Sequence, residues 1–219
     1  MNNTDTREPD SGNTLLKAAE AYNKEPFNPD AATDFFGALY QTWLRKLGRA
    51  VSIVQSPLTS AEIKAAQEHH ERWVPMYIQG DLASSASLPL LDQMFGKTRF
   101  EVGSNQDVVN RIDQSGWFLV PTTSYPANLG SSESKVHDLL ARKGDNAMTL
   151  NTYRLAAQAI RALGFEPYDN LNTLSILPNS LIKGKPVVAG HIGGLHVGVQ
   201  YTYETVHPPV GFRFIKTPK

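Results

Sequence analysis

The stretch "AGHIGGLHVGVQYTY", Ala189–Tyr203, decides how the second half of the chain is expected to fold. Its two adjacent glycines, Gly193 and Gly194, tolerate the positive φ angles that a two-residue hairpin turn requires. Apolar residues alternate with other residues on both sides of the pair, as in β-strands that bury one face. The stretch therefore predicts an antiparallel hairpin that reverses direction at the two glycines.

The register of this hairpin gives the first candidate site. If Gly193 and Gly194 are the two central residues of the turn, His191 lies directly opposite His196. Opposed residues on antiparallel strands have Cβ atoms roughly 4.5–5.5 Å apart, so both imidazoles could reach one ligand or ion. His191 and His196 are therefore the candidate catalytic residues and the candidate metal ligands, with the aliphatic side chains of the hairpin buried on the other face.

The alternative is that the two histidines are ordinary hairpin residues, either exposed or packed against another element. Zinc normally takes three or four protein ligands, and the sequence places no third ligand beside this pair. No metal or other cofactor is therefore predicted.

Composition narrows the class of protein. A chain of 219 residues can bury a substantial core without disulfides or a structural metal. It contains no cysteine, which excludes a thiol nucleophile, a disulfide framework and a cysteine zinc site. No run of about 18 consecutive apolar residues is present, as a membrane-spanning helix would need. We expect a cytoplasmic protein without a membrane partner.

Three regions follow from the pattern along the chain. Residues 1–13 are polar and predicted to be a flexible tail, residues 14–96 to be a helical region, and residues 97–219 to be an α+β domain. The alternative is that the last two regions share one continuous core. Charge differs between the halves, with 8 basic and 12 acidic side chains up to residue 96 and 13 and 9 after it, out of 21 of each sign.

Hydrophobic periodicity and capping signals place the elements. The capping box formed by Thr59 and Glu62 is the clearest helix start, and the apolar side of that helix is expected to continue to Tyr77, with a kink or an end at Pro75. Helices are predicted over residues 14–23, 30–54, 59–77, 84–95, 104–112, 131–144 and 151–163. Strands are predicted over residues 98–103, 117–121, 171–177, 185–192, 195–206 and 210–216. The fold class is therefore α+β, with a helical N-terminal region and a final antiparallel sheet that contains the Gly-Gly hairpin.

The element order of the second half also resembles that of a winged helix, in which the last helix before the hairpin enters the major groove. Arg154, Gln158 and Arg161 have the spacing of one helix face and include residue types that contact bases. These three residues are the candidate nucleic-acid-binding residues, although exposed arginine and glutamine on a helix are equally typical of a solvated surface.

Function is predicted largely from what the sequence lacks. It has no nucleophile motif, no convincing ligand set, no P-loop and no dinucleotide fingerprint. The leading hypothesis is a non-enzymatic binding or assembly protein with another protein as partner. A nucleic-acid-binding accessory protein is the alternative, and a hydrolase or metal-dependent enzyme that uses His191 and His196 comes third.

Overall fold

The computed structural model describes residues 11–24, 26–67, 72–130, 138–139, 141–142, 146–169, 173–191, 194–199 and 210–217. Helices and mixed sheets occur together, so the predicted α+β class is confirmed. The helices are α1 (Ser11–Tyr22), α2 (Pro29–Leu44), α3 (Ser60–Ala66), α4 (Gly80–Ala83), α5 (Leu88–Phe95) and α7 (Leu150–Ala162), with 3-10 turns at Arg45–Leu47, Ser85–Ser87 and Asn105–Asp107. The strands are β1 (Trp73–Ile78), β2 (Arg99–Phe100), β3 (Val108–Asn110), β4 (Gly116–Pro121), β5 (Leu174–Ile182), β6 (Lys185–His191), β7 (Leu195–Val199) and β8 (Val210–Phe212).

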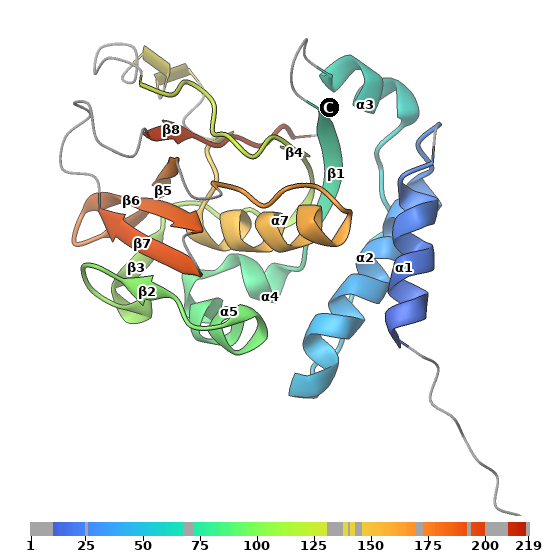
Figure 1. Cartoon of the computed structure of the whole chain (residues 1–219), viewed down its shortest axis with the longest axis horizontal. Coiled ribbons are helices and arrows are strands. Elements are labelled where there is room, and N and C mark those ends of the chain that lie inside the picture. The colour runs from blue at the N-terminus through green and yellow to red at the C-terminus, as the bar shows by residue number, and fades with distance from the viewer. Residues whose placement is uncertain are drawn as a thin grey trace, which may run out of the picture.

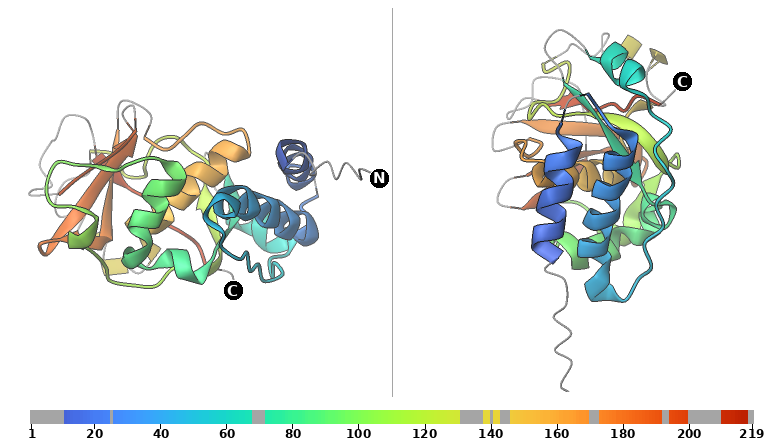
Figure 2. Two further views of the ribbon diagram at one scale, coloured as in Figure 1. Left: turned by 90° about the horizontal axis from the view of Figure 1, so that it is seen from below. Right: turned by 90° about the vertical axis from the view of Figure 1, so that its right-hand side faces the viewer.

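The elements are arranged along one long axis. Helices α1 and α2 lie side by side at one end, strands β5, β6 and β7 lie at the other, and α7 lies between them (Figures 1 and 2). Strands β1 and β4 form a separate two-stranded antiparallel sheet next to α7. The larger sheet has the order β2-β7-β6-β5-β3, and β8 also pairs with β5.

The N-terminal helices differ in their bounds from the sequence prediction. Helix α1 begins at Ser11 and not at Thr14. Helix α2 begins after Asn28, whose side chain caps it, and it ends at Leu44, well before the predicted end at Val54. A 3-10 turn follows, and Gly48 adopts a φ of 62° there, a left-handed conformation that stops a helix.

The capping box is confirmed, but the long helix predicted behind it is wrong. The Thr59 and Glu62 side chains cap each other's backbone at the start of α3, which ends at Ala66. Residues Trp73–Ile78 then form strand β1, in which every residue is buried. Proline is tolerated there because each strand of a two-stranded sheet has an unpaired edge, so Pro75 need not donate a ladder hydrogen bond.

Strand β5 organises the larger sheet. Its pairing with β6 shifts register between Leu177 and Leu181. The first half of β5 pairs in parallel with β8, and the second half pairs antiparallel with β3. Residues 108–110, predicted to be helical, belong to β3. Strand β5 therefore has two different neighbours, one along each half of its length.

Strands β6 and β7 form the predicted antiparallel pair, but their register differs from the prediction by one residue. His191 lies opposite Leu195, and His196 lies opposite Gly190. Since neighbouring side chains on a strand point to opposite faces, His191 and His196 lie on opposite faces of the sheet. The prediction that both imidazoles share a face is wrong. The observed register instead pairs Ala189 with Val197, two fully buried residues, on the face that carries His191. Residues 192 and 193 lie outside the described part.

Helix α7 is the central helix. The Thr149 side chain accepts a hydrogen bond from the backbone N–H of Thr152 and caps its N-terminus. Ten of its 13 residues are buried. The winged-helix hypothesis requires this helix to be exposed, and that expectation is wrong, because the rest of the fold encloses α7.

One large hydrophobic cluster runs from Ala19 in α1 to Ile215 after β8 and includes α7 and both sheets. A smaller cluster lies beside it and contains Ala147, Ile176, Val188, Phe212 and Phe214. Among the described residues, no helix has the length and apolar character needed to cross a bilayer.

Candidate functional site

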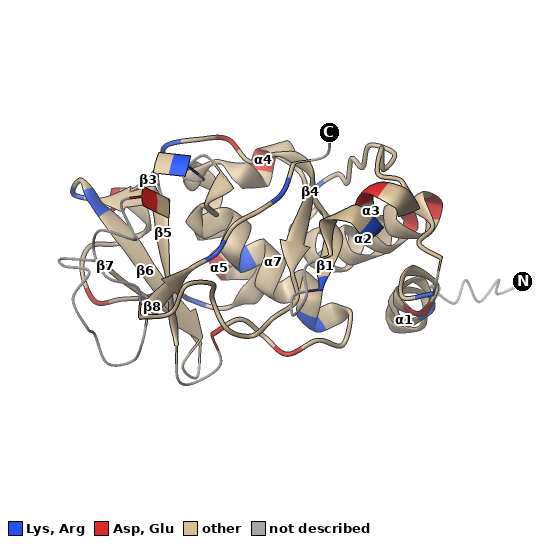
Figure 3. Cartoon of the chain, turned by 90° about the horizontal axis from the view of Figure 1, so that it is seen from above, with Lys and Arg blue, Asp and Glu red and all other residues tan. Residues whose placement is uncertain are grey.

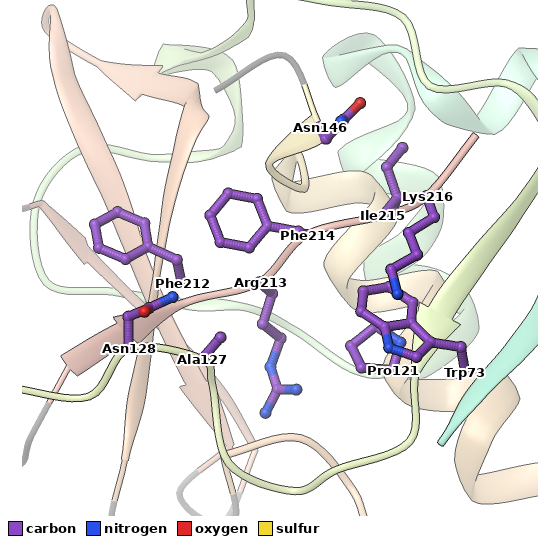
Figure 4. Close-up of a pocket in the computed structure, with 10 residues that line it drawn as sticks. All are labelled: Trp73, Pro121, Ala127, Asn128, Asn146, Phe212, Arg213, Phe214, Ile215 and Lys216. Atoms are coloured by element: carbon purple, nitrogen blue, oxygen red, sulfur yellow. The ribbon is translucent and has the colours of Figure 1, made fainter. Parts of the chain in front are cut away.

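A cavity of about 440 Å³ lies beside the segment that follows β8. Figure 4 shows Trp73 and Lys216 on one side of it, Phe212 and Asn128 on the opposite side, and Phe214 and Arg213 between them. The described residues that line it are Trp73, Pro121, Ala127, Asn128, Asn146, Phe212, Arg213, Phe214, Ile215 and Lys216. Half of the wall therefore comes from five consecutive residues of one extended segment.

That segment is held by three separate parts of the chain. Phe212 forms an isolated β-bridge with Ala127, Phe214 with Ala147, and Lys216 with Leu119. Alternate residues of one extended chain are thus tied to three partners, of which Ala127 also lines the cavity. The strand predicted for residues 210–216 is confirmed only as far as Phe212, and these single bridges replace a continuous ladder after it.

Gly211 permits the close approach that forms one wall. A Cβ atom at this position would lie 2.5 Å from the carbonyl oxygen of Ala127 and about 3 Å from the Pro126 ring, at 3.0 Å from Cγ. Both contacts are closer than real Cβ atoms normally make, so a side chain here would push residues 126–127 away. Glycine at this position therefore brings the Ala127 wall against β8.

Arg213 fixes the floor of the cavity. Its side chain is 1% exposed and forms an ion pair with Asp169, with 3.3 Å between Nη2 and Oδ1. The guanidinium also donates to the carbonyl oxygens of Thr123, at 2.9 Å, and Ser124, at 2.6 Å. It lies over the Tyr168 ring, with Cζ 3.7 Å from the ring centroid. Both the charge and the donor groups of this buried arginine are thereby satisfied.

Asp169 connects this arginine to α7. One carboxylate oxygen, Oδ2, accepts from Tyr153 Oη at 2.8 Å and from Ser175 Oγ at 2.6 Å, while Oδ1 accepts from Thr173 Oγ1 at 2.9 Å. Burial, together with the negative charge of Asp169, raises the pKa of Tyr153 well above its usual value. Tyr153 therefore remains a neutral donor to the carboxylate.

His191 is the one member of the predicted pair that joins this network. Its Nδ1 lies 3.2 Å from the Tyr168 carbonyl oxygen and 3.3 Å from Tyr153 Oη, and its ring stacks on the Tyr153 ring. A carbonyl oxygen only accepts, so Nδ1 carries the proton of the neutral ring and Nε2 carries the lone pair. Burial lowers the pKa of His191, which favours this neutral form.

His196 lies elsewhere. It belongs to the other face of β7, is half-buried, and its Nε2 finds no hydrogen-bond partner within the described ranges. The described residues contain no group of three or more side chains able to hold a metal ion. The structure therefore does not bring the two candidate ligands together.

The candidate nucleic-acid-binding residues do not form one exposed row. Arg154 is 3% exposed, and its Nη1 lies 2.8 Å from Oδ1 of Asp92. Its Nη2 donates to the carbonyl oxygens of Leu91 and Gly96. Gln158 is half-buried, and Arg161 is exposed. Arg154 thus holds α5 against α7 and cannot contact a nucleic acid in this fold.

Charges elsewhere are interspersed. Figure 3 shows Lys and Arg spread over many of the elements, with Asp and Glu between them. Among the residues that the structure describes, no single element collects the basic side chains that a polyanion would contact.

Trp73 and Lys216 lie against each other in the cavity wall. The Lys216 ammonium lies 3.9 Å from the Trp73 ring centroid and donates to the Ala66 carbonyl oxygen at 2.7 Å. Trp73 is 5% exposed, and its indole N–H has no acceptor among the described residues. A buried donor of this kind is uncommon in native proteins, because leaving it unpaired costs free energy.

Comparison of the chain with known protein families, with curated proteins and with solved structures finds no match in any of the three.

Sequence reasoning missed the cavity, because its walls come from segments far apart in the chain. One local signal was present. Arg213 stands between Phe212 and Phe214 in a strand-like run, and an arginine among strongly apolar neighbours must find a buried partner if the run is internal. The partner, Asp169, carried no comparable signal.

Proposed function

We propose that this chain is a non-enzymatic binding protein that holds a small organic ligand in the cavity beside residues 212–216. The observation that carries the proposal is the cavity itself, whose volume of about 440 Å³ and mixed aromatic and polar wall suit a ligand site. Ligand pockets in proteins are typically concave, mostly apolar and roughly 300–1,000 Å³ in volume.

The chemistry of the wall favours binding over catalysis. The described lining residues include no carboxylate, histidine or hydroxyl side chain, which are the usual groups for proton transfer or nucleophilic attack. Lys216, Asn128 and Asn146 are the polar lining residues suited to orienting a ligand, since the donor groups of Arg213 are satisfied within the protein.

The contacts that hold the cavity wall in place also favour a binding function. The ion pair between Arg213 and Asp169 and the three bridges at Phe212, Phe214 and Lys216 hold the wall in one arrangement. A site that is already ordered loses little conformational entropy when a ligand enters.

The test is a fragment screen by nuclear magnetic resonance on the ¹⁵N-labelled full chain. Binders should shift the indole signal of Trp73 and the side-chain amide signals of Asn128 and Asn146, and should be recovered chemically unchanged. Ala127→Phe, which fills the cavity, should abolish these shifts. Ala61→Phe is the matched control, since Ala61 is exposed on α3 and lines no part of the cavity.

Two results would contradict the proposal. One is a screen in which no fragment shifts the cavity signals. The other is a set of binders that bind Ala127→Phe and the wild-type chain equally well, provided that circular dichroism shows the variant to be folded.

A further inference from the structure

Another cavity, of about 520 Å³, lies between the end of α1, helix α3 and the start of β1, and we refer to it as the α1–α3 cleft. Helix α3 packs beside β1 at this place (Figure 1). Among the described lining residues, the cleft shares only Trp73 with the cavity beside residues 212–216. It is therefore a separate candidate site, and its volume is within the range of protein ligand pockets.

Hydrogen bonds join the walls of the α1–α3 cleft in pairs. The Tyr22 hydroxyl at the end of α1 donates to the Pro75 carbonyl oxygen in β1 at 2.6 Å. The Ser60 hydroxyl at the start of α3 donates to the carbonyl oxygen of Phe27, just before α2, at 2.7 Å. The wall formed by α1 and the segment after it is therefore connected to both β1 and α3.

The Gln67 side chain connects the remaining pair of walls, α3 and β1. Its amide nitrogen donates to the Trp73 carbonyl oxygen, and its amide oxygen accepts from the Trp73 backbone N–H, both at 3.0 Å. The cleft is thus ordered before any ligand enters, which lowers the entropy cost of binding.

Three cations line this ordered cleft. They are Lys24 after α1, Lys64 in α3 and Arg72 before β1, and all three are exposed. None of them forms an ion pair with another described residue, and the lining contains no carboxylate within the described ranges. Their charged groups are therefore accessible to an anion from solution.

Arg72 indicates which anion suits the cleft. Its guanidinium lies over the Phe165 ring, with Cζ 5.1 Å from the ring centroid. A guanidinium is a planar fork that can donate to two oxygens of one phosphate. A phosphate monoester carries about 1.5–2 negative charges at neutral pH and three acceptor oxygens, so it matches three cations better than a carboxylate with a single charge does.

An apolar surface lies beside these cations. Phe27 and Ile63 line the cleft and are half-buried, so part of each side chain is accessible. An anion without an apolar part would leave this surface in contact with water, whereas an apolar group on the ligand would cover it, which is favourable.

We propose that the α1–α3 cleft binds a small organic phosphate. Its phosphoryl group lies between Lys24, Lys64 and Arg72. Its apolar part packs against Phe27 and Ile63. Binding forms no covalent bond, and it does not depend on the proposed function of the cavity beside residues 212–216.

The test is isothermal titration calorimetry of the full chain with phenyl phosphate, inorganic phosphate and phenol. Phenyl phosphate should bind about tenfold more tightly than either of the others, because only phenyl phosphate contacts both the cations and the apolar surface. Its affinity should fall when sodium chloride is raised from about 0.05 M to about 0.5 M, since salt screens exposed charges.

Arg72→Gln should weaken the binding of phenyl phosphate about tenfold. Arg99→Gln is the matched control, since Arg99 is exposed on β2 and lines no part of the cleft, and it should leave the affinity unchanged. Lys64→Gln repeats the comparison on α3 and should weaken binding about threefold. Its control is Lys17→Gln, at an exposed position on α1.

Ile63→Ala tests the apolar contact. It should weaken the binding of phenyl phosphate about threefold and leave that of inorganic phosphate unchanged, because only the first ligand has a ring to lose contact. Ala127→Phe, which fills the other cavity, should change neither affinity.

The inference is overturned if phenyl phosphate binds no more tightly than phenol or inorganic phosphate. It is also overturned if Arg72→Gln and Lys64→Gln bind phenyl phosphate as tightly as the wild-type chain does. Neither result touches the proposed function, which depends on signals from the other cavity and on their loss in Ala127→Phe.

Discussion

Asp169 and Arg213 show how much a single buried charge depends on its partner. Both side chains are at most 1% exposed, and five groups besides the ion pair supply hydrogen bonds to one or the other. A buried ion pair contributes little net stability compared with apolar residues of the same size, but removing one member leaves an uncompensated charge. Asp169 therefore holds Arg213, which lines the cavity, and substitution of either residue should disturb that part of the wall.

Arg213→Met should lower the free energy of unfolding by about 3–5 kcal/mol, because it leaves the Asp169 carboxylate buried without its cation. Urea denaturation measures the loss. Arg161→Met is the control, since Arg161 is exposed, and it should change the free energy of unfolding by about 0.5 kcal/mol or less. Equal effects of the two substitutions would show that the ion pair has no structural role.

His191 should make stability depend on pH. Burial lowers its pKa in the folded state, opposed by the hydrogen bond to Tyr168 and by Asp169, with Arg154 and Arg213 acting in the same direction as burial. Below the unfolded pKa of about 6.5, the unfolded chain binds the proton more readily, so stability falls as the pH decreases.

The expected contribution is a slope of up to about 1.4 kcal/mol per pH unit below pH 6.5. It should be absent in His191→Phe, with urea denaturation at several pH values as the measurement. A His191 pKa at or above 6.5 in the folded chain, measured by nuclear magnetic resonance, would contradict this expectation.

At the scale of elements, the hairpin of β6 and β7 shows which structural features the hydrophobic pattern of the sequence predicts and which it does not. Alternation and the glycine pair were sufficient to predict two antiparallel strands. They were insufficient for the register, since turns of two and three residues both fit two glycines, and a shift of one residue moves every side chain to the other face. The burial of Ala189 and Val197 against the core, which depends on distant residues, decides between the two.

The observed register can be tested by cross-linking, because the chain has no cysteine of its own. His191→Cys combined with Leu195→Cys should form a disulfide efficiently under mild oxidation, since these residues are direct partners. His191→Cys combined with His196→Cys should form one poorly, because those side chains point to opposite faces. Mass spectrometry of the oxidised variants distinguishes the two, and a higher yield for the second pair would restore the register expected from the sequence.

In other elements too, features with a local sequence signal were predicted and features that depend on distant contacts were not. The cap at Thr59, the strand at residues 117–121 and the helix now seen as α7 were predicted because each carries a local signal, either a capping box or a regular apolar period. Strand β1 was predicted as a helix because its apolar spacing continued that of α3, and only pairing with β4 makes it extended. The cavity depends on contacts between segments far apart in sequence, and no local pattern contains them.

At the scale of the whole molecule, the large hydrophobic cluster crosses the boundary predicted near residue 97. It joins α1, α2 and β1 to α7 and the larger sheet. A continuous apolar contact of this kind couples the unfolding of the parts it joins, because neither part can expose its side of the contact alone without losing that burial.

Calorimetry should therefore show one unfolding transition, with a calorimetric enthalpy equal to the van't Hoff enthalpy. Phe36→Ala in α2 should lower the melting temperature of the whole chain, because its ring contacts the Trp117 ring in β4, with 5.4 Å between ring centroids. Two resolved transitions, of which this substitution moves only one, would instead support two independent domains.

The extended segment at residues 210–217 has a consequence for how the chain matures. During translation, each contact of this segment has to wait for its later member. Asp169 is synthesised before its ion-pair partner Arg213, and Ala127 and Leu119 are synthesised before their bridge partners Phe212 and Lys216. A nascent chain that has not yet reached residue 212 therefore carries the Asp169 carboxylate without its Arg213 cation and lacks half of the residues that line the cavity. The proposed ligand site is therefore complete only after residues 212–216 have been synthesised and have left the ribosome.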